Sequence, residues 1–152
     1  MKKVAVLLGS SSDEEVMKGC TDYLTKFGIP WDLKILSAHR TPDATAAFVK
    51  SAEENGYALI IAAAGMAAHL PGVAAAYTTL PVIGVPLAGS ELKGVDALYA
   101  IVQMPAGIPV ATVAIGSAGA KNAAVLAAEI LALGEPSLTA RLREFRAAGA
   151  RF

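Results

Sequence analysis

Two histidines, His39 and His69, are the side chains of this sequence that ordinarily titrate near neutral pH. His39 precedes Arg40, whose guanidinium can bind a phosphate or a carboxylate. Such a pair suits acid–base catalysis on an anionic substrate. The alternative is that His39 and Arg40 belong to a solvated surface loop without catalytic function. The dipeptide considered by itself favours this alternative. His69 lies in an alanine-rich segment, where a structural histidine is at least as common as a functional one.

A second polar cluster is Gly9–Asp13, which contains three consecutive serines. Its backbone N–H groups and hydroxyls, at the start of a predicted helix, can hold a phosphate or ribose hydroxyls without net positive charge. The alternative is simple helix capping, for which Ser and Asp are ordinary residues. The segment is neither a Walker loop nor a G-x-G-x-x-G fingerprint, so nucleoside triphosphates and NAD lose support.

Other candidate chemistry is weak. Two histidines and one cysteine show no ligand spacing typical of zinc, so we expect no metal. Cys20 lies in the middle of a predicted helix and is interpreted as packing; a Cys–His nucleophile requires that the fold bring the two together. Gly116–Asn122 could form an anion-binding nest, but small residues at a helix start more often permit close packing.

The elements that must position these residues follow from hydrophobic periodicity. Five short apolar runs alternate with helical segments, and runs that are apolar on both faces indicate strands covered on both sides. This order predicts an α/β three-layer sandwich with a parallel sheet of about five strands. The predicted strands are Val4–Leu8, Trp31–Ile35, Leu59–Ala63, Val82–Val85 and Val110–Ile115.

The helices have local start and stop signals. Ser12 and Glu15 have capping-box spacing, and Pro42 suits a first helical turn. The predicted helices are Ser12–Phe27, Pro42–Asn55, one from about Ala67, Val95–Val102 and Ala118–Leu133. The tail Ser137–Ala148 carries apolar residues at helical spacing with arginines between them. It looks too polar for the domain core, so we expect it to pack on a neighbouring subunit.

The strand-end rule selects the loops that can carry function. In an open parallel sheet, ligands bind beyond the carboxyl ends of the strands. Gly9–Asp13, Ser37–Pro42 and Ala64–Gly72 all follow predicted strands, and both histidines fall in them. This position favours the catalytic interpretation of His39 and Arg40.

Length and composition exclude several classes. The 152 residues fit one domain, 1–152, and 13 basic residues balance 13 acidic ones, so nucleic acid and anionic membranes are not expected partners. One cysteine and an early polar segment predict a reducing, cytoplasmic location. The richest apolar stretch, Tyr57–Leu70, is too short to span a membrane. The hydrophobic content of 55% therefore predicts a homo-oligomer.

Taken together, the motifs resemble those of the N5-carboxyaminoimidazole ribonucleotide mutase family of purine synthesis. The matching segments, in order along nearly the whole chain, are GSSSD (9–13), SAHRTP (37–42), AAHLPG (67–72), LPVIGVP (80–86), IVQMP (101–105), PVATVAIG (109–116) and AGAKNAA (118–124). The resemblance implies a flavodoxin-like domain in a homo-octamer, with active sites at subunit junctions and no cofactor or metal. It also implies a place after an ATP-dependent carboxyaminoimidazole ribonucleotide synthase.

The resemblance also implies residue roles. His39 matches the acid–base histidine and Arg40 the phosphate-binding arginine. Ser10 and Asp13 match ligands of the ribose phosphate portion. The positions that enclose the migrating carboxyl group are Ser37, Ala64, Gly65 and His69, and those of a loop near the substrate are Met104 and Pro105. The sequence departs from the family pattern at Ala63 and Met66, where many members have glycine.

The implied reaction moves a carboxyl group from the exocyclic nitrogen of the ribonucleotide to ring carbon C4, by decarboxylation and recarboxylation. One alternative is a carboxylase that joins free CO2 to aminoimidazole ribonucleotide, and another is a non-catalytic flavodoxin-like nucleotide-binding module. SAHRTP together with HLPG favours the mutase.

Overall fold

The computed structural model describes residues 1–152, and its centre is a five-stranded sheet in the order β2-β1-β3-β4-β5. All neighbouring strands are parallel, which confirms the predicted α/β sandwich. The strands are β1 (Lys3–Leu8), β2 (Trp31–Ile35), β3 (Tyr57–Gly65), β4 (Val82–Leu87) and β5 (Ala111–Thr112). β1 and β3 form the middle of the sheet, so the loops that follow β2, β1 and β3 are neighbours.

β5 is shorter than the predicted run Val110–Ile115. It is an edge strand with β4 as its single neighbour. Beyond Thr112 the bonding continues irregularly, with the Val113 amide donating to the Gly84 carbonyl and the Gly116 amide to the Pro86 carbonyl. Pro86 has no N–H to donate in return, so the regular ladder does not continue past the Gly84–Thr112 pair.

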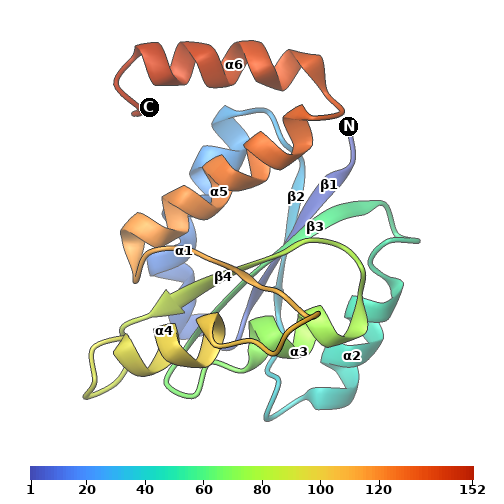
Figure 1. The fold of residues 1–152 in the computed structure, drawn as a ribbon, viewed down its shortest axis with the longest axis vertical. Helices are drawn as coiled ribbons and strands as arrows, with labels where there is room; N and C mark the ends of the chain where they lie inside the picture. The colour runs from blue at the N-terminus through green and yellow to red at the C-terminus, as the bar shows by residue number, and fades with distance from the viewer.

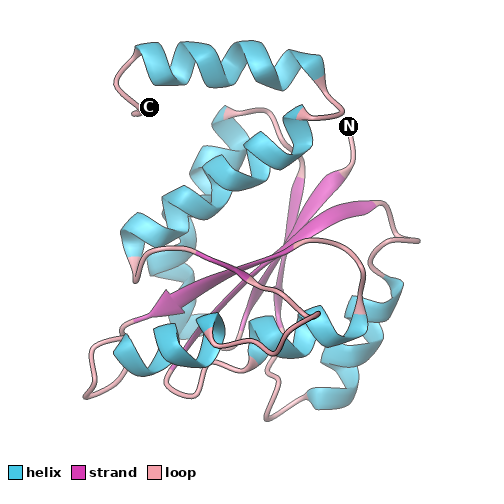
Figure 2. Ribbon diagram, in the orientation of Figure 1, coloured by secondary structure: helices cyan, strands magenta, loops and turns pink.

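Helices cover both faces of the sheet and complete three layers (Figures 1 and 2). One face carries α1 (Glu14–Lys26), α5 (Ser117–Ala132) and α6 (Pro136–Ala147), and the other carries α2 (Pro42–Ser51), α3 (Leu70–Tyr77) and α4 (Val95–Val102). Along β1, Val4, Val6 and Leu8 join the first core while Ala5 and Leu7 join the second. This period of two explains why the strand is apolar on both faces.

Several helix starts differ from the sequence prediction. The capping box at Ser12 and Glu15 does not form: residues Ser11–Asp13 make a 3-10 turn, η1, and α1 begins at Glu14. The Ser10 hydroxyl caps this turn by accepting from the Ser12 amide at 3.3 Å. α3 begins at Leu70, not near Ala67. The bounds predicted for α4 are confirmed.

α6 corrects one expectation. Leu138 is fully buried and Phe145 is 5% exposed, and both belong to the core between the sheet, α1 and α5. Phe145 packs edge to face on Phe27, and the Arg141 guanidinium donates to the Phe27 carbonyl. The tail is therefore not too polar for the core, because Leu138 and Phe145 are buried while the Arg141 guanidinium has a backbone carbonyl as its partner. Packing on a neighbouring subunit stays a prediction.

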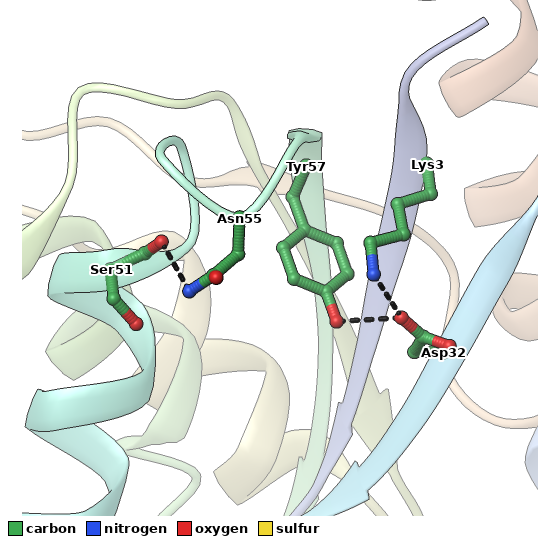
Figure 3. A network of polar contacts seen from close by, with 5 residues as sticks. All are labelled: Lys3, Asp32, Ser51, Asn55 and Tyr57. Atoms are coloured by element: carbon green, nitrogen blue, oxygen red, sulfur yellow. Dashed lines mark hydrogen bonds and ion pairs between the residues drawn. The ribbon is translucent and has the colours of Figure 1, made fainter.

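A polar network joins the amino-terminal ends of three strands, away from the predicted site (Figure 3). Lys3 of β1 and Tyr57 of β3 both donate to Asp32 Oδ2 of β2, each at 2.7 Å. The hydrogen bond from Lys3, followed by that from Tyr57, lowers the pKa of Asp32. These contacts tie the β2 edge to the centre of the sheet.

Two further features concern predictions from the sequence. Cys20 is fully buried in α1, and burial raises the pKa of its thiol to about 12, so the packing interpretation is confirmed. None of the helices combines the length and the apolar character that crossing a membrane requires.

Candidate active site

A cleft of about 450 Å³ lies at the carboxyl ends of β1, β2 and β3. All eight site residues identified from the sequence line it: Ser10, Asp13, Ser37, His39, Arg40, Ala64, Gly65 and His69. Met104 and Pro105 do not. Of the two departures from the family pattern, Ala63 is fully buried in the core and Met66 reaches the cleft. The strand-end rule thus located one continuous site, while the role of each residue stays a prediction.

The loop after β1 offers hydroxyls and one carboxylate. Ser10 Oγ and Ser12 Oγ are 2.9 Å apart, and the Asp13 amide donates to the Ser10 carbonyl at 3.1 Å. Partial burial raises the pKa of Asp13, and the backbone hydrogen bond with Ser10 opposes this shift. A partly desolvated carboxylate beside the Ser10 and Ser12 hydroxyls is suited to hydroxyl donors on a ligand, such as those of a ribose.

The loop after β2 is closed by hydroxyl groups at both ends. The Ser37 amide donates to Thr41 Oγ1 at 3.0 Å, the Arg40 amide to Ser37 Oγ at 3.1 Å, and the Thr41 amide to the Ser37 carbonyl at 3.0 Å. The hydroxyl of buried Thr45 donates to the same Ser37 carbonyl at 3.1 Å. These bonds fix the turn that presents His39 and Arg40.

Sequence reasoning missed the role of Thr41 and Thr45 in this turn. The sequence does contain a signal for this turn: the hydroxyl residues Ser37 and Thr41 lie on either side of His39-Arg40, and Thr41 directly precedes the proline that opens α2. Ser and Thr hydroxyls commonly bond to nearby backbone groups in turns.

The two histidines form a hydrogen-bonded pair. His39 Nε2 and His69 Nδ1 are 2.7 Å apart, and the rings meet edge to face with centroids 4.8 Å apart. His39 comes from the loop after β2, and His69 is the residue that precedes the first turn of α3. The bond needs one nitrogen with a proton and one without, so at least one ring of the pair is neutral. A neutral imidazole next to a possible proton donor is the arrangement that proton transfer requires.

The loop after β3 supplies small apolar walls. Ala64 and Gly65 end β3, and a Cβ on Gly65 would lie 3.3 Å from the Leu87 carbonyl oxygen, so glycine permits close packing of β3 on β4. Nowhere do three His, Cys, Asp or Glu side chains gather in a way that could hold a metal ion. The cleft therefore combines one histidine pair, one arginine and one carboxylate with apolar walls.

Comparison with known proteins identifies the family. The family model described as AIR carboxylase matches residues 3–151. The chain belongs to the AIR carboxylase family. Relatives named N5-carboxyaminoimidazole ribonucleotide mutase include those of Brucella melitensis, 58% identical over 95% of this chain and 90% of that protein, and Escherichia coli K12, 53% identical over 96% and 86%. The Thermotoga maritima relative of the same name is 51% identical over 96% of this chain and 84% of its own length.

Solved structures agree with this membership. The crystal structure of Treponema denticola PurE matches with a TM-score of 0.87 and 30% identity over 97% of this chain and 90% of that chain. The relatives confirm the resemblance inferred from the motifs, and the sheet order together with the structural match confirms the flavodoxin-like fold. This chain is accordingly an enzyme of the mutase type.

Proposed function

We propose that this protein converts N5-carboxyaminoimidazole ribonucleotide to 4-carboxy-5-aminoimidazole ribonucleotide in the biosynthesis of IMP. The observation that carries the proposal is the His39–His69 pair at 2.7 Å in a strand-end cleft with small apolar residues on its β3 side, within a chain whose relatives of that name are 51–58% identical to it. The substrate and product are isomers that differ in the positions of one carboxyl group and one proton. A single proton-transfer group beside a water-poor space is sufficient chemistry for that exchange.

Binding is assigned to the loops after β1 and β2. Arg40 binds the phosphate, because a guanidinium can donate two parallel hydrogen bonds to it. Ser10 and Asp13 bind the ribose phosphate portion, with the carboxylate accepting from hydroxyl groups. The Ser37 hydroxyl accepts from the Arg40 amide, so it holds the turn that positions Arg40 for phosphate binding.

The proposed chemistry has two steps in which atoms and charge balance. Protonated His39 donates its proton to the exocyclic nitrogen as the N–C bond of the carbamate breaks and CO2 is released. Ring carbon C4 then attacks CO2, and neutral His39 removes the proton from C4, which restores the aromatic ring. The net change moves the carboxyl group from nitrogen to carbon and a proton from carbon to nitrogen, and His39 returns to its starting state.

His69 and the β3 loop support these steps. The hydrogen bond between His39 and His69 orients the His39 ring and sets the tautomer of its neutral form. Ala64 and Gly65 enclose the carboxyl group, and their small size brings the backbone close to it. Apolar walls keep water from the released CO2.

The proposal extends to the assembly and its setting. We assign a single catalytic domain, 1–152, a homo-octamer, a cytoplasmic location and a step after the ATP-dependent synthase that makes the carbamate. An exposed apolar stripe on α4 supports assembly: Val95, Tyr99 and Val102 are 44%, 63% and 44% exposed at helical spacing.

The deciding experiment is a spectrophotometric assay of the purified protein on the synthetic carbamate without added bicarbonate. Conversion to the C4-carboxylated product supports the mutase. Product formed from aminoimidazole ribonucleotide and bicarbonate, with no use of the carbamate, would instead assign the carboxylase. Binding without any turnover would leave a nucleotide-binding module.

A further inference from the structure

Met66 lines the cleft in an unusual backbone conformation. Its φ angle is +57°, in the left-handed region that side-chain-bearing residues rarely adopt, and its side chain is 63% exposed although it is apolar. A non-glycine residue in this region is strained, and such strain persists where the surroundings over-determine the backbone.

The backbone that follows Met66 leads directly to His69. The Ala68 amide donates to the Met66 carbonyl at 2.9 Å, and the His69 amide donates to the Ala67 carbonyl at 2.7 Å. These two tight turns follow one another and lead from the end of β3 to the start of α3. Glycine would adopt the Met66 conformation without strain. The backbone conformation alone would therefore favour glycine, and the methionine differs from glycine in what its side chain adds to the cleft.

The Met66 side chain differs in size and exposure from the other apolar residues that line the cleft. Its neighbours on the cleft wall are small, namely Ala64, Gly65, Ala67 and Gly89, and Leu70 is buried beneath them. Met66 is the one large apolar side chain of the lining that is exposed. An unbranched thioether with three rotatable bonds adapts to the shape of whatever lies beneath it.

We propose that Met66 is a specificity-determining residue whose side chain covers the carboxyl-transfer space and hinders exchange of released CO2 with dissolved CO2. This inference rests on the proposed mutase function. The cover makes no bond to the substrate. The Met66 side chain slows the escape of released CO2, so that C4 attacks a larger share of it. The side chain equally slows the entry of dissolved CO2.

The test follows the labelled carboxyl carbon through wild type, Met66→Leu, Met66→Ala and Met66→Gly. Each enzyme receives carbamate with ¹³C in the carboxyl group in excess unlabelled bicarbonate, and mass spectrometry measures the label retained in the product. We expect wild type and Met66→Leu to retain most of the label, and Met66→Ala and Met66→Gly to lose several-fold more. Alanine keeps the strained backbone without the bulk, so it separates cover from strain.

A second readout excludes slow chemistry as the cause of label loss. We measure kcat/KM for aminoimidazole ribonucleotide with bicarbonate, which an opened cleft raises several-fold and a damaged catalytic site lowers. Label retention in Met66→Ala equal to wild type, label loss in Met66→Leu equal to Met66→Ala, or complete label dilution in wild type would each overturn the inference while conversion of the carbamate stands. Wild-type protein that does not convert the carbamate would overturn the proposed function, and this inference with it.

Discussion

His39 Nε2 and His69 Nδ1 lie 2.7 Å apart although 30 residues separate them along the chain. The sheet order explains this contact, since β2 and β3 flank β1 on opposite sides. The loops after these two strands therefore meet above the carboxyl end of β1. Each histidine sits at the start of a helix or its preceding turn, so both rings are held by the fold and not by the substrate.

The first prediction concerns His39→Asn, which keeps polarity and approximate size but cannot shuttle a proton. We expect turnover of the carbamate to fall by about 10²–10⁴-fold, the usual contribution of a general acid–base group. Circular dichroism and nucleotide binding should stay close to wild type, because the side chain contributes to no buried core. Retention of more than about a tenth of the wild-type rate would exclude an essential proton-transfer role.

The second prediction uses the pairing of the two rings. If His69 acts by orienting His39, then His69→Asn should lower kcat less than His39→Asn does, and the double variant should be no slower than His39→Asn alone. Additive losses in the double variant would show that the two histidines act independently.

The sequence predicted those features that depend on local pattern. The uninterrupted apolar run of β1 predicted a parallel strand that is covered on both faces. The apolar periodicity of Val95–Val102 predicted the bounds of α4. The strand-end rule collected the site residues in one cleft because parallel strands carry their following loops to one edge.

Features that depend on tertiary packing were not predictable in the same way. The His39–His69 contact requires the strand order, which no local spacing contains. The sequence prediction that the tail lies outside the domain core was wrong because it judged the segment by its average polarity. In the structure Leu138 and Phe145 of α6 are buried, while Arg146 pairs with Glu129 on the surface. Choosing among consecutive serines for the cap of η1 depends on the path of the backbone, which spacing alone does not define.

The third prediction concerns the clamp of the catalytic turn. Thr41→Val removes the hydroxyl that accepts from the Ser37 amide, while Thr41→Ser retains it. Losing this bond should cost about 0.5–1.5 kcal/mol and lower Tm by roughly 1–6 °C. Since the turn carries His39 and Arg40, both kcat and phosphate binding should weaken in the valine variant. Thr41→Ser should recover most of both; equal damage in the two variants would point to packing of the methyl group instead.

The fourth prediction is the pH dependence that the Lys3–Asp32–Tyr57 network gives to stability. The pKa of Asp32 is lower in the folded protein than in the unfolded chain, so its stabilisation is present above the unfolded value of about 3.9 and is lost as pH falls through the folded value. The pKa of Lys3 is raised, first by its hydrogen bond to Asp32, so that contribution is lost as pH rises through the folded value of the lysine.

Urea titrations across the acid range measure the first of these contributions. Asp32→Asn should flatten the decline of unfolding free energy below about pH 4 relative to wild type. The effect should be small, because the pair is solvent-exposed, and it should shrink further in high salt. If the unfolding free energy of Asp32→Asn declined in acid as steeply as that of the wild type, the pH dependence would belong to other carboxylates.

The last prediction separates the role of α6 in the subunit core from assembly into an octamer. Light scattering of the wild type should give a mass near eight subunits. Tyr99→Glu places a charge in the middle of the exposed α4 stripe, where the wild-type ring is 63% exposed, so it should reduce this mass without unfolding the subunit. Phe145→Ala should act differently: the ring is 5% exposed within the subunit's own core, and its removal should destabilise folding by about 3–5 kcal/mol. A monomeric wild type would refute the octamer. A dissociated but equally stable Phe145→Ala subunit would instead show that α6 serves mainly as an interface between subunits.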